Sequence, residues 1–213
     1  MKEPLILGCT AEAIKKAAEI IGGGGLVVYP TDTLYGLGCS ALDEGAIKRL
    51  YAVKRRDLSK PVSIAVCDLR MLRRYTSFDE KAMQVLERFL PGPVTIILQK
   101  KGLPDLLTGG GRTIGIRIPE NRAALRLIMN AGVPVVSTSA NVSGREPPET
   151  PEEVLEQIPG VDLILDAGRL EGPPSTVIDL TTEKPRILRE GRKPSWEIAV
   201  VLEEIYGGFE KRG

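Results

Sequence analysis

The stretch TIGIRIPENRAALRLIMNAGVPVVSTS, residues 113–139, contains the alternation that decides the fold. In its first seven residues isoleucine stands at every second position, which is typical of a strand that buries one face. Residues 120–132 then predict a helix that ends at Gly132, and residues 133–139 predict a second strand. A strand, a helix and a strand in succession indicate an α/β protein.

The rest of the chain repeats this alternation on both sides of the stretch. Further strands are predicted at residues 25–30, 62–67, 94–99, 161–168, 175–181 and 185–190. Further helices are predicted at residues 10–25, 44–55, 77–90, 150–158 and 195–207. Thr10, a capping box of Ser77 with Glu80, and a second box of Thr150 with Glu153 mark three helix starts. We expect one α/β domain over residues 1–213, with a mixed parallel and antiparallel sheet flanked by helices.

The composition restricts the chemistry that this chain can perform. Its 213 residues include 29 Lys and Arg, 28 Asp and Glu, three Cys and no His. Without histidine there is no Ser-His-Asp triad, no Cys-His dyad and no His-ligated zinc. The remaining groups suit phosphate chemistry with a Mg²⁺ ion held largely by the substrate. No long apolar run and no export signal are present, so we expect a soluble cytoplasmic protein with no membrane contact.

Small and polar residues recur at every second position in three predicted strands. The residues that share these faces are Thr113, Gly115 and Arg117; Ser137, Ser139 and Asn141; and Ser175 and Asp179 on either side of Val177. The hydroxyls of Thr31 and Thr33 come from a fourth segment. Two interpretations stay open: separate strands that each expose one face to solvent, or one polar cavity shared by all of them. In the second case, Gly115 would let a ligand approach the backbone.

Positive charge gathers in KRRDLSKP, residues 54–61, directly after a predicted helix. Cations are favourable at a helix C-terminus, so this segment is either a solvated helix end or a site for an anion. The glycine runs 22–25 and 109–111 lack the Lys-Ser/Thr of a phosphate-binding loop. We expect a helix stop at the first run and a flexible loop at the second.

Six ordered motifs resemble the YrdC-type threonylcarbamoyl-AMP synthase family over about residues 11–192. The motifs are YPTDTLYGLGC, KRRDLSKPVSI, LPGPVTIIL, TIGIRIP, VVSTSANVSG and GPPSTVIDL. The resemblance implies a twisted YrdC-like sheet around a positively charged central cavity. It also implies a nucleotidyltransferase that makes L-threonylcarbamoyl-adenylate and pyrophosphate from L-threonine, bicarbonate and ATP, with Mg²⁺. A separate transferase complex would then modify the adenosine 3′ of the anticodon in tRNAs that read ANN codons.

The resemblance assigns roles to residues at matching motif positions. The residues implied to bind ATP are Lys54, Arg56, Lys60, Thr113, Ser139, Pro147 and Arg189. The residues implied to bind threonine are Thr33, Arg117, Ser137 and Ser175, with Arg117 expected to pair with the carboxylate. No general base and no metal-ligating side chain is implied, although Asn141 is expected to be a neighbour of any metal. Ala65 stands where some members have a histidine, so that contact is expected to be missing.

Some relatives carry a further C-terminal domain, and this chain resembles the short single-domain form. Weak binding of tRNA or double-stranded RNA is compatible with a synthase, and two alternatives to a synthase stay open. The first is an RNA-binding module without chemistry, which the balanced charge and an aromatic content of 4% disfavour. The second is a carbamoyl-adenylate-forming domain of the hydrogenase-maturation type, which shares the fold but sits in longer proteins.

Overall fold

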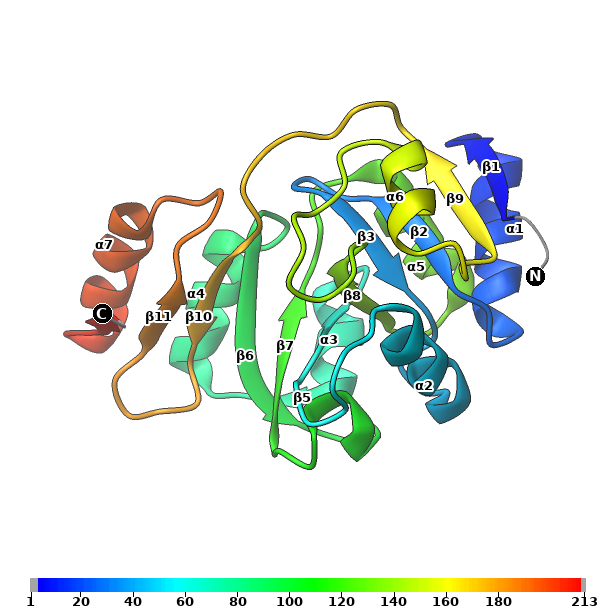
Figure 1. Cartoon of the computed structure of the whole chain (residues 1–213). Helices are drawn as coiled ribbons and strands as arrows, with labels where there is room; N and C mark the ends of the chain where they lie inside the picture. The colour runs from blue at the N-terminus through cyan, green and yellow to red at the C-terminus, as the bar shows by residue number, and fades with distance from the viewer. Residues whose placement is uncertain (1–3, 212–213) are drawn as a thin grey trace.

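The computed structural model describes residues 4–211, and its twelve strands in this range form one strongly twisted sheet (Figure 1). Their order is β1-β9-β2-β3-β8-β4-β7-β6-β10-β11-β12, with β5 paired to β6. The strand bounds are Leu5–Gly8 (β1), Val27–Pro30 (β2), Tyr35–Gly38 (β3), Ser63–Ala65 (β4), Thr76–Ser77 (β5), Val94–Lys100 (β6), Thr113–Arg117 (β7), Val135–Ser139 (β8), Leu163–Asp166 (β9), Thr176–Asp179 (β10), Arg186–Arg189 (β11) and Glu210–Lys211 (β12). Both parallel and antiparallel pairs occur, which confirms the expected mixed sheet.

The helices account for most of the remaining described residues. Their bounds are Ala11–Gly22 (α1), Glu44–Val53 (α2), Leu69–Tyr75 (α3), Glu80–Phe89 (α4), Arg122–Ala131 (α5), Pro151–Gln157 (α6) and Ser195–Tyr206 (α7), with a 3₁₀ turn at Asp105–Thr108 (η1). The predicted helices are therefore all present. Sequence patterns did not predict α3, η1 or the short strands β1, β3, β5 and β12, because these are too short to show a periodicity.

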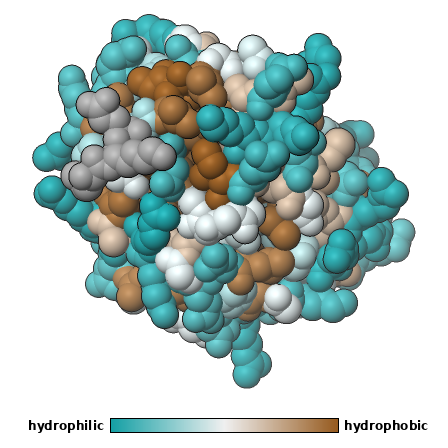
Figure 2. Space-filling model, turned by 90° about the vertical axis from the view of Figure 1, so that its right-hand side faces the viewer, coloured by the Kyte–Doolittle hydropathy of each residue, from teal (hydrophilic) through white to brown (hydrophobic). Residues whose placement is uncertain are grey.

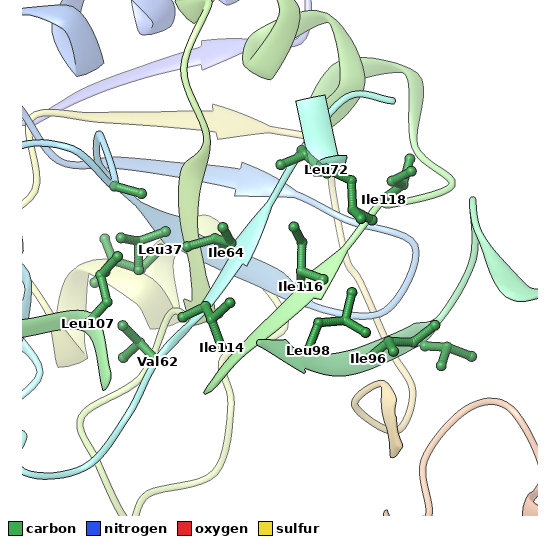
Figure 3. Packing of buried hydrophobic residues seen from close by; sticks show 14 of the residues in the cluster. Leu37, Val62, Ile64, Leu72, Ile96, Leu98, Leu107, Ile114, Ile116 and Ile118 are labelled. Carbon is green, nitrogen blue, oxygen red and sulfur yellow. The ribbon is translucent and has the colours of Figure 1, made fainter. Parts of the chain in front are cut away.

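The isoleucines of β7 build the larger of two apolar clusters. Ile114 and Ile116 are almost completely buried on one face of the sheet. The cluster continues through neighbours on the adjacent strands, which Figure 3 labels as Ile64, Ile96 and Leu98. Residues of α2, α3, α4, α6 and α7 pack against this face. Burial of each such side chain stabilises the fold by about 1.5–3 kcal/mol.

The opposite face of the sheet is only partly covered by helices. There α1 packs against α5, and both cover a smaller cluster that includes Tyr29 of β2 and Val135 of β8. Farther along the same face, β8 turns Ser137 outward and β4 turns Ser63 outward, opposite each other in the register. This second half of the face carries small and polar side chains, and a cavity opens there.

Of the three predicted N-cap residues, Thr10 and Thr150 are present and Ser77 is wrong. Thr10 Oγ1 accepts a hydrogen bond from the third residue of its helix at 3.2 Å, and Thr150 Oγ1 does the same at 3.3 Å. The predicted box at Thr150 is only half formed, because Glu153 accepts the amide of Glu149 at 2.8 Å and not that of Thr150. At α4, however, Asp79 is the cap, and its side chain accepts the amide of Ala82 at 2.8 Å. The predicted box of Ser77 with Glu80 fails because Ser77 pairs with β6 as part of β5.

Strand β3 passes close under the ring of Tyr29, and only glycine allows this approach. A Cβ atom added at Gly38 would lie 2.8 Å from that ring and 2.7 Å from the carbonyl oxygen of Val136. The glycine thus brings the PTDT loop, residues 30–33, and β3 into the sheet beside β8.

The sheet ends at β1, whose Leu5 and Ile6 are about 40% exposed, at 39% and 41%. Figure 2 views this side of the molecule and shows apolar surface among hydrophilic side chains. Within residues 4–211, the helices are all too short or too polar to cross a membrane.

Candidate active site

A cavity of about 270 Å³ opens on the half of the sheet that α1 and α5 leave uncovered. Strands β8, β4, β7 and β6 supply its floor, and the β2–β3 loop forms one wall. Residues 174–175 line it from another side, at the end of the segment that crosses from β9 to β10 in Figure 1. Sheet order therefore collects residues that are far apart in the sequence around one space.

The floor of the cavity is made of small residues with hydroxyl groups. Ser137 and Ser63 face each other on β8 and β4, and Gly115 lies next to them on β7. A Cβ atom at Gly115 would lie 2.5 Å from Ser63 Oγ and 3.1 Å from a methyl group of Thr95. The absence of a side chain at Gly115 thus leaves room for Ser63 and Thr95. We had expected a ligand to approach the backbone here, but these two side chains occupy that space, and Gly115 itself does not line the cavity.

Three arginines give the cavity its charge. Arg56, Arg117 and Arg189 line it, and among the described residues no aspartate or glutamate does. Burial lowers the pKa of Arg189 below its ordinary value, and the like charge of Arg117 lowers it further. Guanidinium groups in this number favour carboxylate or phosphate ligands, which accept paired hydrogen bonds from them.

Arg189 is held by Ser175, the residue that directly precedes β10. Its Nη2 donates to the carbonyl oxygen of Ser175 at 2.8 Å, and its Nε donates to the same oxygen at 3.2 Å. The hydroxyls of Ser175 and Thr95 are hydrogen-bonded at 2.8 Å. These contacts hold the start of β10 against β6 at the edge of the cavity.

Arg56 is positioned by an unusual helix end. The chain leaves α2 with Arg55 in the left-handed region, at a φ of 49°, and the amide of Arg56 donates to the carbonyl of Tyr51 at 2.9 Å. This is the hydrogen bond of a Schellman motif, in which glycine usually holds the position of Arg55. The guanidinium of Arg56 donates to the carbonyl oxygens of Lys60 at 3.3 Å and Pro61 at 2.8 Å.

The loop that follows, residues 57–61, is shaped by Asp57. Its carboxylate accepts the amide of Ser59 at 2.8 Å, and these hydrogen bonds lower the pKa of Asp57 below its usual range. The hydroxyl of Tyr51 donates to the carbonyl of Lys60 at 2.8 Å. The side chain of Lys60 is exposed and does not line the cavity.

Lys54 lies beneath the cavity wall and not on its surface. Only 1% of it is exposed, and its Nζ donates to the carbonyl oxygens of Ser139 and Asn141, at 2.5 and 2.8 Å. Burial lowers its pKa to about 7, and the nearby charge of Arg56 contributes. The lysine therefore connects the end of α2 to the end of β8.

The structure brings most of the residues implied by the resemblance together. Those that line the cavity are Thr33, Arg56, Arg117, Ser137, Ser139, Ser175 and Arg189. Those that do not are Lys54, Lys60, Thr113 and Pro147. Asn141 is 6% exposed, and its side-chain oxygen accepts from Ser139 Oγ, so it lies behind the wall next to Lys54.

Sequence reasoning missed Ser63 and Thr95 on the cavity floor and Asp32 behind the cavity. The signal that could have found Ser63 and Thr95 is their alternation with Ile64, Val94 and Ile96, which belong to the apolar cluster on the other face of the sheet. Asp32 forms a buried ion pair with Arg117 just behind the cavity. Ala65 is fully buried beside α1 and α5, so its side chain makes no cavity contact.

A mixed sheet with a cavity of arginines and hydroxyls on one face defines an α/β protein built to bind a polar, anionic ligand. A family model described as "Telomere recombination", that of the Sua5/YciO/YrdC domain, matches residues 19–191. The chain belongs to the Sua5/YciO/YrdC family.

Three relatives show how far this likeness extends. A putative threonylcarbamoyl-AMP synthase of Methanocaldococcus jannaschii is 40% identical over 191 residues, 88% of either chain. A structure of Pyrococcus abyssi Sua5 in complex with L-threonine is 36% identical with a TM-score of 0.90, over 99% of this chain and 63% of that one. Escherichia coli YciO is 34% identical with a TM-score of 0.82, over 90% and 97%. The chain thus spans less than two-thirds of the Sua5 chain.

Proposed function

We propose that this chain is a threonylcarbamoyl-AMP synthase that converts L-threonine, bicarbonate and ATP to L-threonylcarbamoyl-adenylate and pyrophosphate. The observation that carries the proposal is the cavity itself, in which three arginines and the hydroxyls of the floor meet in one space. Two of the similar proteins support it by name: the putative synthase of M. jannaschii and the Sua5 protein solved with L-threonine.

The arrangement of charge suits both substrates. Arg117 lies beside Thr33, where its guanidinium can pair with a carboxylate, and it is the candidate for the carboxylate of threonine. Arg56 lines the cavity from the loop that follows α2, and it is the candidate for phosphate oxygens, together with the exposed Lys60 of the same loop. The hydroxyls of Ser137 and Ser175 also line the cavity and are candidates for the amino acid.

The chemistry needs no histidine. The neutral amine of threonine adds to carbon dioxide with loss of a proton to water, or to bicarbonate with loss of water, and gives a carbamate. An oxygen of the carbamate then attacks the α-phosphorus of ATP in line, and the bond from that phosphorus to the departing pyrophosphate breaks. Negative charge grows on the α-phosphate and the departing pyrophosphate, and fixed arginines stabilise it. Holding the reactants in position supplies up to about 7–11 kcal/mol of the barrier reduction.

Magnesium would enter with the nucleotide. Within residues 4–211 no three His, Cys, Asp or Glu side chains gather in a way that could hold a metal ion. Mg²⁺ is commonly bound by substrate phosphates and water with few protein ligands, and the residues present fit that arrangement. When bound, it would neutralise phosphate charge. The adenylate would pass to a downstream transferase complex for tRNA modification, and weak contact with tRNA or double-stranded RNA belongs to the same proposal.

The test is product analysis with ATP, Mg²⁺ and bicarbonate. Each of threonine, serine, valine and carbamoyl phosphate is added separately, and adenylate and pyrophosphate are measured. We expect threonine to react best, serine less well and valine very poorly, because unpaired buried hydroxyl partners cost about 1–3 kcal/mol each. Adenylate formation with carbamoyl phosphate alone, or none with threonine, would contradict the proposal. Arg117→Lys is the companion variant, and it should raise the KM for threonine far more than the KM for ATP.

A further inference from the structure

We propose that Asp32 is a positioning residue for the amino-acid substrate, which orients Arg117 from behind so that the free edge of its guanidinium faces the cavity. The inference rests on the proposed function and extends it to a residue that sequence reasoning left unassigned. It depends on the ion pair between these two side chains, on which of their atoms are buried, and on which of them line the cavity.

The ion pair is almost completely removed from solvent. Arg117 Nη2 donates to Asp32 Oδ1, and the side chains are only 7% and 10% exposed. A buried pair of this kind costs desolvation energy, and removal of one partner leaves an uncompensated charge. Since Arg56 and Arg189 also line the cavity, Asp32 supplies the one negative side chain that the described structure pairs with these arginines.

Two further atoms of the pair are buried without a hydrogen-bond partner. They are Asp32 Oδ2 and Arg117 Nε. In a guanidinium, Nε and Nη2 share one edge, and an aspartate can bind that edge with both oxygens. Asp32 Oδ2 and Arg117 Nε are therefore the two atoms that would form the second hydrogen bond of a bidentate pair. Asp32 lies on the edge of the guanidinium that Nε and Nη2 form.

The other edge of the guanidinium points toward the cavity. Arg117 Nη1 donates to Thr33 Oγ1 at 3.4 Å, a long contact, and both Arg117 and Thr33 line the cavity. Asp32 does not line it. The carboxylate thus fixes the arginine from behind and leaves Nη1 and Nη2 hydrogens for the carboxylate of a bound amino acid, with the Thr33 hydroxyl beside them.

Asp32 itself is held from two directions. Its carbonyl oxygen accepts from Arg192 Nη1 at 2.7 Å, a contact from the loop between β11 and α7. On either side of it, the hydroxyls of Thr31 and Thr33 are hydrogen-bonded at 3.0 Å, and Thr31 Oγ1 also donates to the carbonyl of Leu34 at 2.7 Å. A loop fixed in this way can fix the direction of Arg117.

The direction in which the threonine KM changes in Asp32→Asn distinguishes two roles of Asp32: positioning Arg117, or occupying Arg117 in place of the substrate carboxylate. If Asp32 positions Arg117, Asp32→Asn raises the KM for threonine about tenfold or more, because small misplacements of a binding group are costly, and the KM for ATP changes little. If instead Asp32 occupies Arg117 as a stand-in for the substrate carboxylate, the same variant lowers the KM for threonine. A lowered or unchanged threonine KM overturns the proposal.

A double-mutant cycle tests whether Asp32 acts through Arg117. In the variants Asp32→Asn, Arg117→Lys and the double variant, we expect the two effects on threonine KM to be strongly non-additive. Additive effects overturn the proposal. Asp162→Asn is the matched control, since that carboxylate also pairs with an arginine, Arg49, but outside the cavity; its threonine KM should equal that of the wild type.

Calorimetric threonine titration distinguishes the failure of this inference from failure of the proposed function. A wild-type protein that does not bind threonine overturns both. A wild-type protein that binds threonine, with an Asp32→Asn variant that binds equally well, overturns the positioning role alone. If circular dichroism shows that Asp32→Asn does not fold, Asp32→Glu keeps the charge and replaces it in the cycle, with the same non-additivity expected.

Discussion

Arg55 adopts a left-handed backbone conformation, which is unfavourable for a residue with a side chain but is needed for the chain to turn from α2 into the next loop. Apart from glycines, it is the residue of the described chain with a positive φ, at 49°, and it directs the chain from α2 into the loop that contains Arg56. A side chain in the left-handed region costs about 1–2 kcal/mol. Strain of this kind is common where a site must be held in one shape.

We predict that Arg55→Gly stabilises the protein by about 1 kcal/mol, because glycine adopts this φ without the steric cost, less the entropy it adds to the unfolded chain. The midpoint of urea unfolding measures the effect. Arg55→Ala is the control, since it removes the same charge and keeps the Cβ atom. Equal midpoints for the two variants would show that charge, and not backbone strain, sets the difference.

Single residues differ in how far the sequence could assign them. Arg117 was found because isoleucine alternates with it, so its face had to be the polar one, and the structure places it in the cavity. Asp32 was missed because one acid between two threonines has no periodic pattern. Its role depends on Arg117, which is 85 residues away in the chain. For Lys54, the motif implied a contact with the phosphates of ATP. In the structure its side chain is buried and bonds to the carbonyl oxygen of Ser139 at the end of β8.

At the scale of elements, the loop between β6 and β7 supports the positive loop after α2. Gly109 ends η1 at a φ of 58°, and a Cβ atom there would lie 2.5 Å from the carbonyl oxygen of Ser59. Gly109 therefore packs against the segment that presents Arg56. We had expected a flexible loop here, and the close contact gives Gly109 a more specific role.

We predict that Gly109→Ala raises the KM for ATP several-fold, because the added methyl group pushes the loop of Ser59 and Arg56 away from the cavity. Gly110→Ala is a matched control: that residue also has a positive φ, 85°, but nothing lies within 4 Å of its added Cβ. Both variants bear the backbone cost of about 1 kcal/mol, and only the first should change ATP dependence. A similar ATP KM in the two variants would contradict the contact.

For the whole molecule, Lys54 joins elements that are distant in the sequence. Its ammonium holds the carbonyls at the end of β8, and its own carbonyl accepts the amide of Ser143 at 2.9 Å. Burial lowers the pKa of this lysine from the ordinary 10.5 to about 7. Between these values the unfolded chain binds the proton and the folded chain does not, so stability rises with pH across the interval.

We predict that this rise is lost in Lys54→Met. Urea unfolding at several pH values between about 7 and 10 should give a free-energy difference, wild type minus variant, that increases with pH. Loss of the hydrogen bonds of Lys54 lowers the free energy of unfolding by a similar amount at every pH. The informative quantity is therefore the slope of the free energy of unfolding against pH. The control is Lys48→Met, which replaces an exposed lysine of α2, and its curve should run parallel to that of the wild type. Parallel curves for Lys54→Met would mean that its pKa is not lowered.

The sequence by itself determined the α/β class, the helices and the longer strands, because these follow from periodicities within about ten residues. It also determined which faces of β7 and β8 are polar, and its motifs indicated the family. The tertiary structure alone decided which polar faces share a cavity, since β8, β4, β7 and β6 become neighbours only through sheet order. It decided as well that Asp32 meets Arg117 and that Lys54 lies behind β8. These contacts join residues some 85 positions apart, and no local pattern encodes them, because they arise when the chain folds and buries its apolar face.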